Sequence, residues 1–110
     1  MKLIIAIVQD EDSSRLLTGL MNKGLGVTKL ATTGGFLKAG NTTLLIGVED
    51  ERVSEAVETI EQICKSRKQL TTAHTNATGV SASGYMPFPV EVTVGGATLF
   101  VVNVEQFLKV

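Results

Sequence analysis

Several short segments of the chain have the hydrophobic pattern of β-strands. Residues 3–8, 43–48 and 97–104 are apolar at almost every position, which is typical of strands that are covered on both faces of a sheet. Residues 90–94 alternate between valine and polar residues, so they predict a strand with one exposed face. A further strand is expected over residues 27–32.

A first amphipathic helix is predicted after the N-terminal strand. Leucine and methionine recur at helical spacing between Leu16 and Met21. Asp12 or Ser13 is expected to cap the start of this helix, since short polar side chains accept hydrogen bonds from its free N–H groups. Gly24 is well placed to end it.

A second helix is predicted to start at Asp50, which is expected to act as its cap. Its ends suit the helix dipole, because residues 49–51 are acidic and Lys65, Arg67 and Lys68 lie near its end. The apolar stripe that would face the core consists of Val53, Ala56, Val57, Ile60, Ile63 and Cys64.

Loops and turns are predicted between these elements. Flexible loops are expected near residues 33–41 and 71–86, which are rich in small and polar residues. Gly95 and Gly96 predict a tight hairpin turn, after which residues 97–104 would pair back onto the preceding strand.

The order of the elements predicts the fold. It contains the βαββαβ pattern of the ferredoxin-like fold. We therefore expect one α+β domain over residues 1–110, a ferredoxin-like sandwich with an extra C-terminal hairpin strand. Both helices of such a fold cover the same face of the sheet. Because three strands are apolar on both faces, the other face also needs a cover, and a symmetric homo-oligomer would provide it.

Composition and charge narrow the function classes. The formal net charge of −1 provides no basic field for nucleic acid or an anionic membrane. No apolar run approaches the roughly 20 residues that a membrane-spanning helix needs. Residues 1–8 are too short for a signal sequence and are followed by acidic residues. Cys64 is the only cysteine, so no intrachain disulfide is possible. We expect a cytoplasmic protein.

Candidate binding chemistry is concentrated in residues 28–43. This stretch is rich in threonine and glycine, has no acidic residue, and places Phe36 directly after Gly34 and Gly35. Glycine lets backbone N–H groups approach a ligand, hydroxyls and amides supply neutral hydrogen bonds, and an aromatic face stacks on a flat ring. The combination suits a nucleotide, although a polar hairpin loop without a ligand would have the same composition.

Several longer sequence segments resemble those of one known family. Residues 4–10, TTGGFL at residues 32–37, AGNTT at residues 39–43, and residues 89–92 and 94–98 look like the PII-like cyclic-di-AMP receptors. The likeness covers nearly the whole chain. It implies a cytoplasmic homotrimer that binds cyclic-di-AMP in clefts between subunits. Ordering of the loops would then signal to a downstream protein, which the sequence does not identify.

The resemblance also implies roles for individual residues. Thr28 would hydrogen-bond a phosphate, and the backbone at Gly35, Phe36 and Leu37 would meet an adenine, with Phe36 adding stacking. Two of these residues have plain structural alternatives. Thr28 would also suit an ordinary strand, and Phe36 would also fill a subunit interface.

Three further residues belong to the implied site. Asn41 would bond the ribose or base, Gly47 would leave room for the ligand, and Phe100 would supply an apolar wall. Asn41 also suits a turn, and Gly47 suits close strand packing. The sequence departs from the family pattern at Gly26 and Lys38, where arginine is frequent. The loss of a guanidinium near phosphate predicts weaker binding or another nucleotide preference.

The sequence is also consistent with two functions other than a receptor. One is a small phosphoester hydrolase on the same scaffold, and the other is a PII-like oligomeric interaction protein with another nucleotide or no ligand. Residues 28–43 contain no Cys, His, Asp, Glu or Arg, the residue types that hydrolysis uses as nucleophile, base or clamp. His74 has no partner at metal-ligand spacing. We therefore expect no enzyme activity, no metal ligand and no cofactor.

Overall fold

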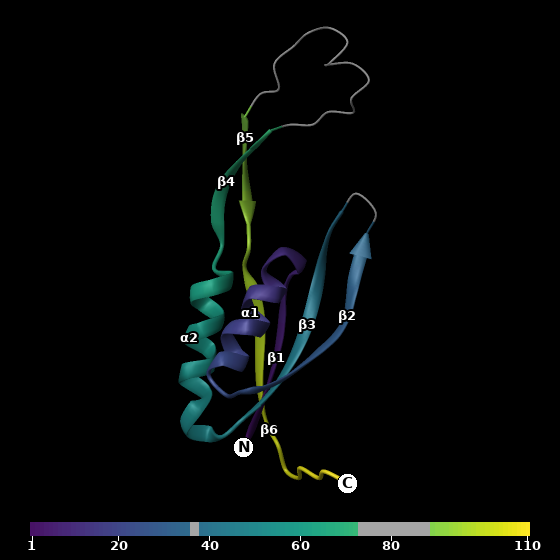
Figure 1. Cartoon of the computed structure of the whole chain (residues 1–110), viewed down its shortest axis with the longest axis vertical. Coiled ribbons are helices and arrows are strands. Elements are labelled where there is room, and N and C mark those ends of the chain that lie inside the picture. The colour runs from purple at the N-terminus through teal and green to yellow at the C-terminus, as the bar shows by residue number, and fades with distance from the viewer. Residues whose placement is uncertain (36–37, 73–88) are drawn as a thin grey trace, which may run out of the picture.

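The computed structural model describes residues 1–35, 38–72 and 89–110. The α-helices pack against one sheet, and a ribbon of strands extends beyond one end of that sheet (Figure 1). The elements are β1 (Lys2–Gln9), α1 (Asp10–Asn22), β2 (Gly26–Gly35), β3 (Lys38–Val48), the 3₁₀ helix η1 (Asp50–Arg52), α2 (Val53–Cys64), β4 (Arg67–Thr72), β5 (Pro89–Val94) and β6 (Ala97–Asn103).

The main sheet has the strand order β2-β3-β1-β6, and every neighbouring pair is antiparallel. Two helices accompany this sheet, one after β1 and one after β3. This is the arrangement of a βαββαβ unit in which β6 takes the place of the fourth strand. The mixed α/β architecture is therefore compatible with the predicted ferredoxin-like, PII-like fold.

The prediction of a hairpin between β5 and β6 is wrong. β5 pairs with β4 in a separate two-stranded sheet, whereas β6 pairs with β1. Gly95 and Gly96, with φ angles of 86° and 94°, connect two strands of different sheets, and Figure 1 shows β5 leading almost straight into β6. The glycine pair provides a local change of direction without returning the chain on itself.

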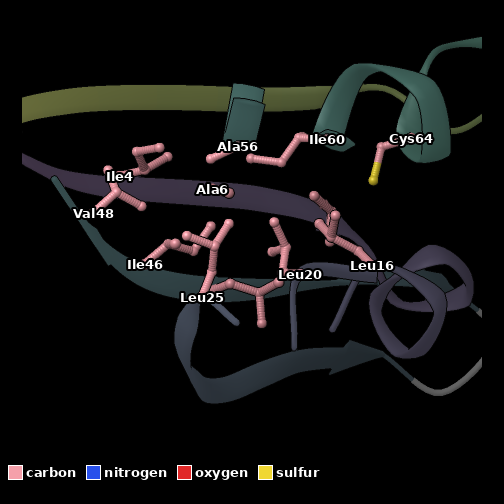
Figure 2. Packing of buried hydrophobic residues seen from close by; sticks show 12 residues of the cluster. Ile4, Ala6, Leu16, Leu20, Leu25, Ile46, Val48, Ala56, Ile60 and Cys64 are labelled. Carbon is pink, nitrogen blue, oxygen red and sulfur yellow. The ribbon is translucent and has the colours of Figure 1, made fainter. Parts of the chain in front are cut away.

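The core lies between the two helices and one face of the main sheet. Along β1, Ile4, Ala6 and Val8 are at most 1% exposed, because alternate residues of a strand point to the same face. Figure 2 shows Leu16 and Ile60 among the helix side chains that meet this face. The opposite face has no helix, and its β1 residues are only half-buried.

Gly24 ends α1 as predicted. Its φ of 77° lies in the left-handed region, and its N–H donates to the carbonyl of Met21 at 2.9 Å. The N–H of Leu25 donates to the carbonyl of Leu20 at 3.1 Å, which completes a Schellman motif. Leu20 and Leu25 are both buried, so this chain reversal is also part of the core.

The predicted helix caps are wrong. α1 begins at Asp10, directly after β1. Asp12 and Ser13 therefore lie inside its first turn, and the hydroxyl of Ser13 donates to the carbonyl of Asp10 at 2.8 Å. Asp50 belongs to η1, where its carboxylate pairs with the α-ammonium group of Met1 at 3.0 Å.

Much of the segment near residues 33–41 is strand and not loop, since β2 continues to Gly35 and β3 begins at Lys38. Residues 36–37 lie outside the described part of the chain. So do residues 73–88, which include most of the second predicted loop, and residues 71–72 belong to β4.

Candidate functional site

The helix-free face of the main sheet contains a row of residues from all four strands. Thr28 of β2 lies opposite Leu45 of β3, Leu45 lies opposite Ile5 of β1, and Ile5 lies opposite Phe100 of β6. Residues that face each other across antiparallel strands project to the same side of a sheet. Two predicted site residues, Thr28 and Phe100, therefore share this face, at opposite edges of the sheet.

Gly47 and Asn41 lie on the same face. Gly47 pairs with Gly26 of β2 and Leu3 of β1. It is two residues from Leu45, which lies in the row of Thr28, so it projects to the same face. Asn41 is on β3, an even number of residues from Gly47, so its side chain projects to the same side. The register of the sheet thus places Thr28, Asn41 and Gly47 on one surface.

A pocket of about 580 Å³ lies on this face, within the range of roughly 300–1,000 Å³ that small-molecule sites occupy. Thr28 and Gly47 line it together with Gly26, and the segment after β6 contributes Phe107 and Lys109. Two of the predicted ligand residues therefore border a common cavity. Phe100 and Asn41 are not among its lining residues.

The glycines of the pocket are not required by packing within one chain. A Cβ atom at Gly26 would meet no heavy atom within 4 Å, and one at Gly47 would meet only the side chain of Met1, at 3.8 Å. Neither glycine is among those with positive φ. Within a single chain, the structure therefore gives no packing reason for glycine at position 47.

Asn41 lies at the opposite end of β3 from the pocket. It pairs with Gln9 of β1 and Thr33 of β2. It is six positions before Gly47, which corresponds to about 20 Å along an extended strand. Next to it, the buried Thr42 donates a hydrogen bond to the carboxylate of Asp10, which fixes this end of β3 to the start of α1.

Comparison with known proteins identifies the family. The family model for the cyclic-di-AMP receptor matches residues 1–110. The protein belongs to the cyclic-di-AMP receptor family. Among solved structures, a protein from Pediococcus pentosaceus that is described as functionally unknown is 41% identical, with a TM-score of 0.77. The match covers 99% of this chain and 96% of the other. The family is a receptor family, so the hydrolase alternative is not favoured.

In this member of the cyclic-di-AMP receptor family, an ion-pair cluster joins α1 to the ribbon. The side chain of Asp12 is fully buried, and its two oxygens accept hydrogen bonds from Arg67 at 2.7 and 3.0 Å. Arg15 donates a third hydrogen bond at 3.0 Å. The hydrogen bond from Arg67 lowers the pKa of Asp12 below its usual value, and Arg15 acts in the same direction.

This cluster is not apparent from the sequence. Arg67 was expected at the end of the second helix with Lys65 and Lys68, but α2 ends at Cys64 and Arg67 begins β4. Asp12 and Arg67 are far apart in the sequence, and no local pattern links them. The one local sign in the sequence that Asp12 would be buried is its helical spacing to the apolar residues Leu16 and Leu20.

The connection between β5 and β6 lies at the same place, where the ribbon joins the rest of the domain. The N–H of Gly95 donates to the side-chain carbonyl of Gln9 at 2.7 Å, and the N–H of Gly96 donates to the carbonyl of Cys64. Cys64 is a core residue, as predicted, and burial raises the pKa of its thiol to about 11. The thiol is therefore a poor nucleophile near neutral pH.

The remaining predicted residues are only partly described. Gly35 ends β2, where its backbone pairs with Lys38 of β3. Phe36, Leu37 and His74 lie outside the described residues. Within the part of the chain that the structure covers, no three His, Cys, Asp or Glu residues are grouped as a metal site requires. No helix of these residues is long and apolar enough to cross a membrane.

Proposed function

We propose that the protein is a cytoplasmic signal receptor that binds cyclic-di-AMP in clefts between the subunits of a homotrimer. The observation that carries this proposal is the pocket lined by Thr28 and Gly47, which opens on the helix-free face of a chain that belongs to the cyclic-di-AMP receptor family. The ligand is the signal, and no cofactor and no catalytic residue take part.

The exposed apolar surface supports assembly. Phe100 and Val102 of β6 are 51% and 42% exposed in the single chain, and they lie opposite Ile5 and Leu3 on the helix-free face. Burial of such a surface is favourable by about 25 cal/mol per Å². A second and third copy of the chain would cover it, as the resemblance to PII-like proteins implies.

The distance between the candidate residues supports a cleft shared by two subunits. Asn41 and Gly47 lie at opposite ends of β3, about 20 Å apart along the strand. Within one chain they are too far apart to contact the same adenine. A neighbouring subunit that brings its own Asn41 toward the pocket would complete the site.

Each candidate residue has a role in the proposed complex. Thr28 donates its hydroxyl hydrogen to a phosphate oxygen, Gly47 leaves space for the ligand, and Asn41 bonds the ribose or base. Phe100 supplies an apolar wall. The backbone at Gly35, Phe36 and Leu37 receives an adenine, with Phe36 stacked on its ring.

The proposed output is a change in surface. Binding would change the surface where β2 ends and β3 begins, and a downstream protein would recognise the ordered, ligand-bound form. A ligand can shift such an equilibrium only if it binds the ordered state better. Contacts from Gly35, Phe36 and Leu37 to the adenine would provide that difference in affinity.

Isothermal titration calorimetry tests the proposal. We expect the purified protein to bind cyclic-di-AMP more tightly than cyclic-di-GMP or ATP, and Thr28→Ala to weaken binding by about tenfold, the value of one hydrogen bond to a charged group. Thr18→Ala, an exposed threonine of α1, is the matched control. Absence of cyclic-di-AMP binding, tighter binding of another nucleotide, or turnover of the ligand would contradict the proposal.

A further inference from the structure

The segment after β6 lies against the candidate pocket. Val104 is half-buried, and its N–H donates to the carbonyl of Met1 at 3.2 Å. Figure 1 shows both ends of the chain at the same end of the sheet. Val104, Phe107 and Lys109 all line the pocket that contains Thr28. This segment therefore forms a wall of the site.

The residues of this segment alternate in their environment. Phe107 and Lys109 line the pocket, whereas Leu108 between them does not and is 72% exposed. The segment thus contributes one aromatic residue and one lysine to the lining of the same cavity.

The charge of Lys109 is the notable feature of this wall. Among the described residues that line the pocket, no other side chain is charged. Lys109 makes no ion pair with the described residues, whereas the α-ammonium group of Met1, another lining residue, is paired with Asp50 at 3.0 Å. Position 26, where the resemblance leads us to expect arginine, is glycine.

We propose that Lys109 binds a phosphate of the cyclic dinucleotide beside Thr28 and so replaces the cation that Gly26 does not supply. This inference rests on the proposed function. Each phosphodiester of the ligand carries one negative charge, and a hydroxyl donor alone leaves that charge unbalanced. A hydrogen bond from an ammonium group to an anionic oxygen is stronger than a neutral one. The flexible stem of lysine allows the charge to reach the phosphate from the pocket wall.

Binding of cyclic-di-AMP to Lys109→Gln, measured by calorimetry at low and high salt, tests this inference. We expect about tenfold weaker binding, the effect of losing one charge-assisted hydrogen bond, and a smaller loss of affinity on adding salt than in the wild type. Lys65 is an exposed lysine that directly follows α2 and does not line the pocket. Lys65→Gln should therefore bind the ligand as the wild type does. Adding Gly26→Arg to Lys109→Gln should restore affinity.

The outcomes separate this inference from the proposed function. If the wild type binds cyclic-di-AMP and Lys109→Gln binds equally well with the same salt dependence, the role of Lys109 is refuted and the receptor proposal stands. Equal weakening by Lys65→Gln would also refute it, because the effect would then reflect net charge alone. If the wild type binds no cyclic-di-AMP, both proposals fail.

Discussion

Arg67, at the start of β4, holds both carboxylate oxygens of Asp12 in the first turn of α1, with hydrogen bonds of 2.7 and 3.0 Å. The carboxylate is fully buried, whereas the guanidinium side chain is 34% exposed. Through this pair the start of the β4–β5 ribbon is joined to the body of the domain. Gly95 and Gln9 make a further link in the same place.

Removal of Arg67 should destabilise the protein. Arg67→Met leaves the buried carboxylate of Asp12 with Arg15 as its remaining cation, so we expect the free energy of unfolding to fall by about 2 kcal/mol. Lys68→Met removes an exposed pair with Glu91 from the same strand and should cost less than about 1 kcal/mol. Urea denaturation measures both, and equal losses would show that burial of Asp12 adds nothing.

The same pair predicts a dependence of stability on acid. The hydrogen bonds from Arg67 lower the pKa of Asp12 in the folded state below its usual value. This contribution to stability is therefore present above the unfolded pKa and is lost as the pH falls through the folded pKa. Asp12→Asn should make the unfolding free energy less dependent on pH below about pH 4. A slope identical to that of the wild type would contradict this assignment.

The connection between β5 and β6 should require glycine more strictly at position 95 than at position 96. A Cβ atom at Gly95, where φ is 86°, would lie 2.7 Å from the carbonyl oxygen of Lys65. Gly95→Ala should therefore cost more than the roughly 1–2 kcal/mol of left-handed backbone strain alone. Gly96→Ala, with φ of 94° and open space, should show only that strain. Thermal unfolding ranks the variants, with Gly26→Ala as the neutral control.

The helix-free face should be the subunit interface. Val102→Glu places a charge on this apolar surface, so we expect the trimer to dissociate. Thr18→Glu, on the exposed side of α1, should leave assembly unchanged. Sedimentation velocity distinguishes the two. A Val102→Glu protein that remains trimeric would place the interface elsewhere.

The strands of the main sheet and both helices were predictable because their signals are local. The continuous apolar run of β1 and the glycine with left-handed backbone at position 24 each depend on a few neighbouring residues. The partner of β6 was not predictable in this way. Gly95 and Gly96 between two strand-like segments give the same local signal for a hairpin and for a passage between sheets, and pairing with the distant β1 decides the outcome.

The candidate site was predictable in part. The resemblance pointed to Thr28 and Gly47, and the register of the sheet brings both to one pocket. Lys109 was missed because the last residues of the sequence have no periodic pattern that would place them. Asp12 and Arg67 were missed for a related reason, since their pairing depends on how α1 and β4 meet in three dimensions.

Binding of cyclic-di-AMP to Gly47→Val, compared with the wild type by calorimetry, tests the location of the site most directly. A Cβ atom at this position would meet only the side chain of Met1 within 4 Å, at 3.8 Å, so the fold should be retained while ligand space is filled. We predict an unchanged melting temperature and binding weakened by at least about tenfold. A folded Gly47→Val protein that binds cyclic-di-AMP as tightly as the wild type would contradict a site in this pocket.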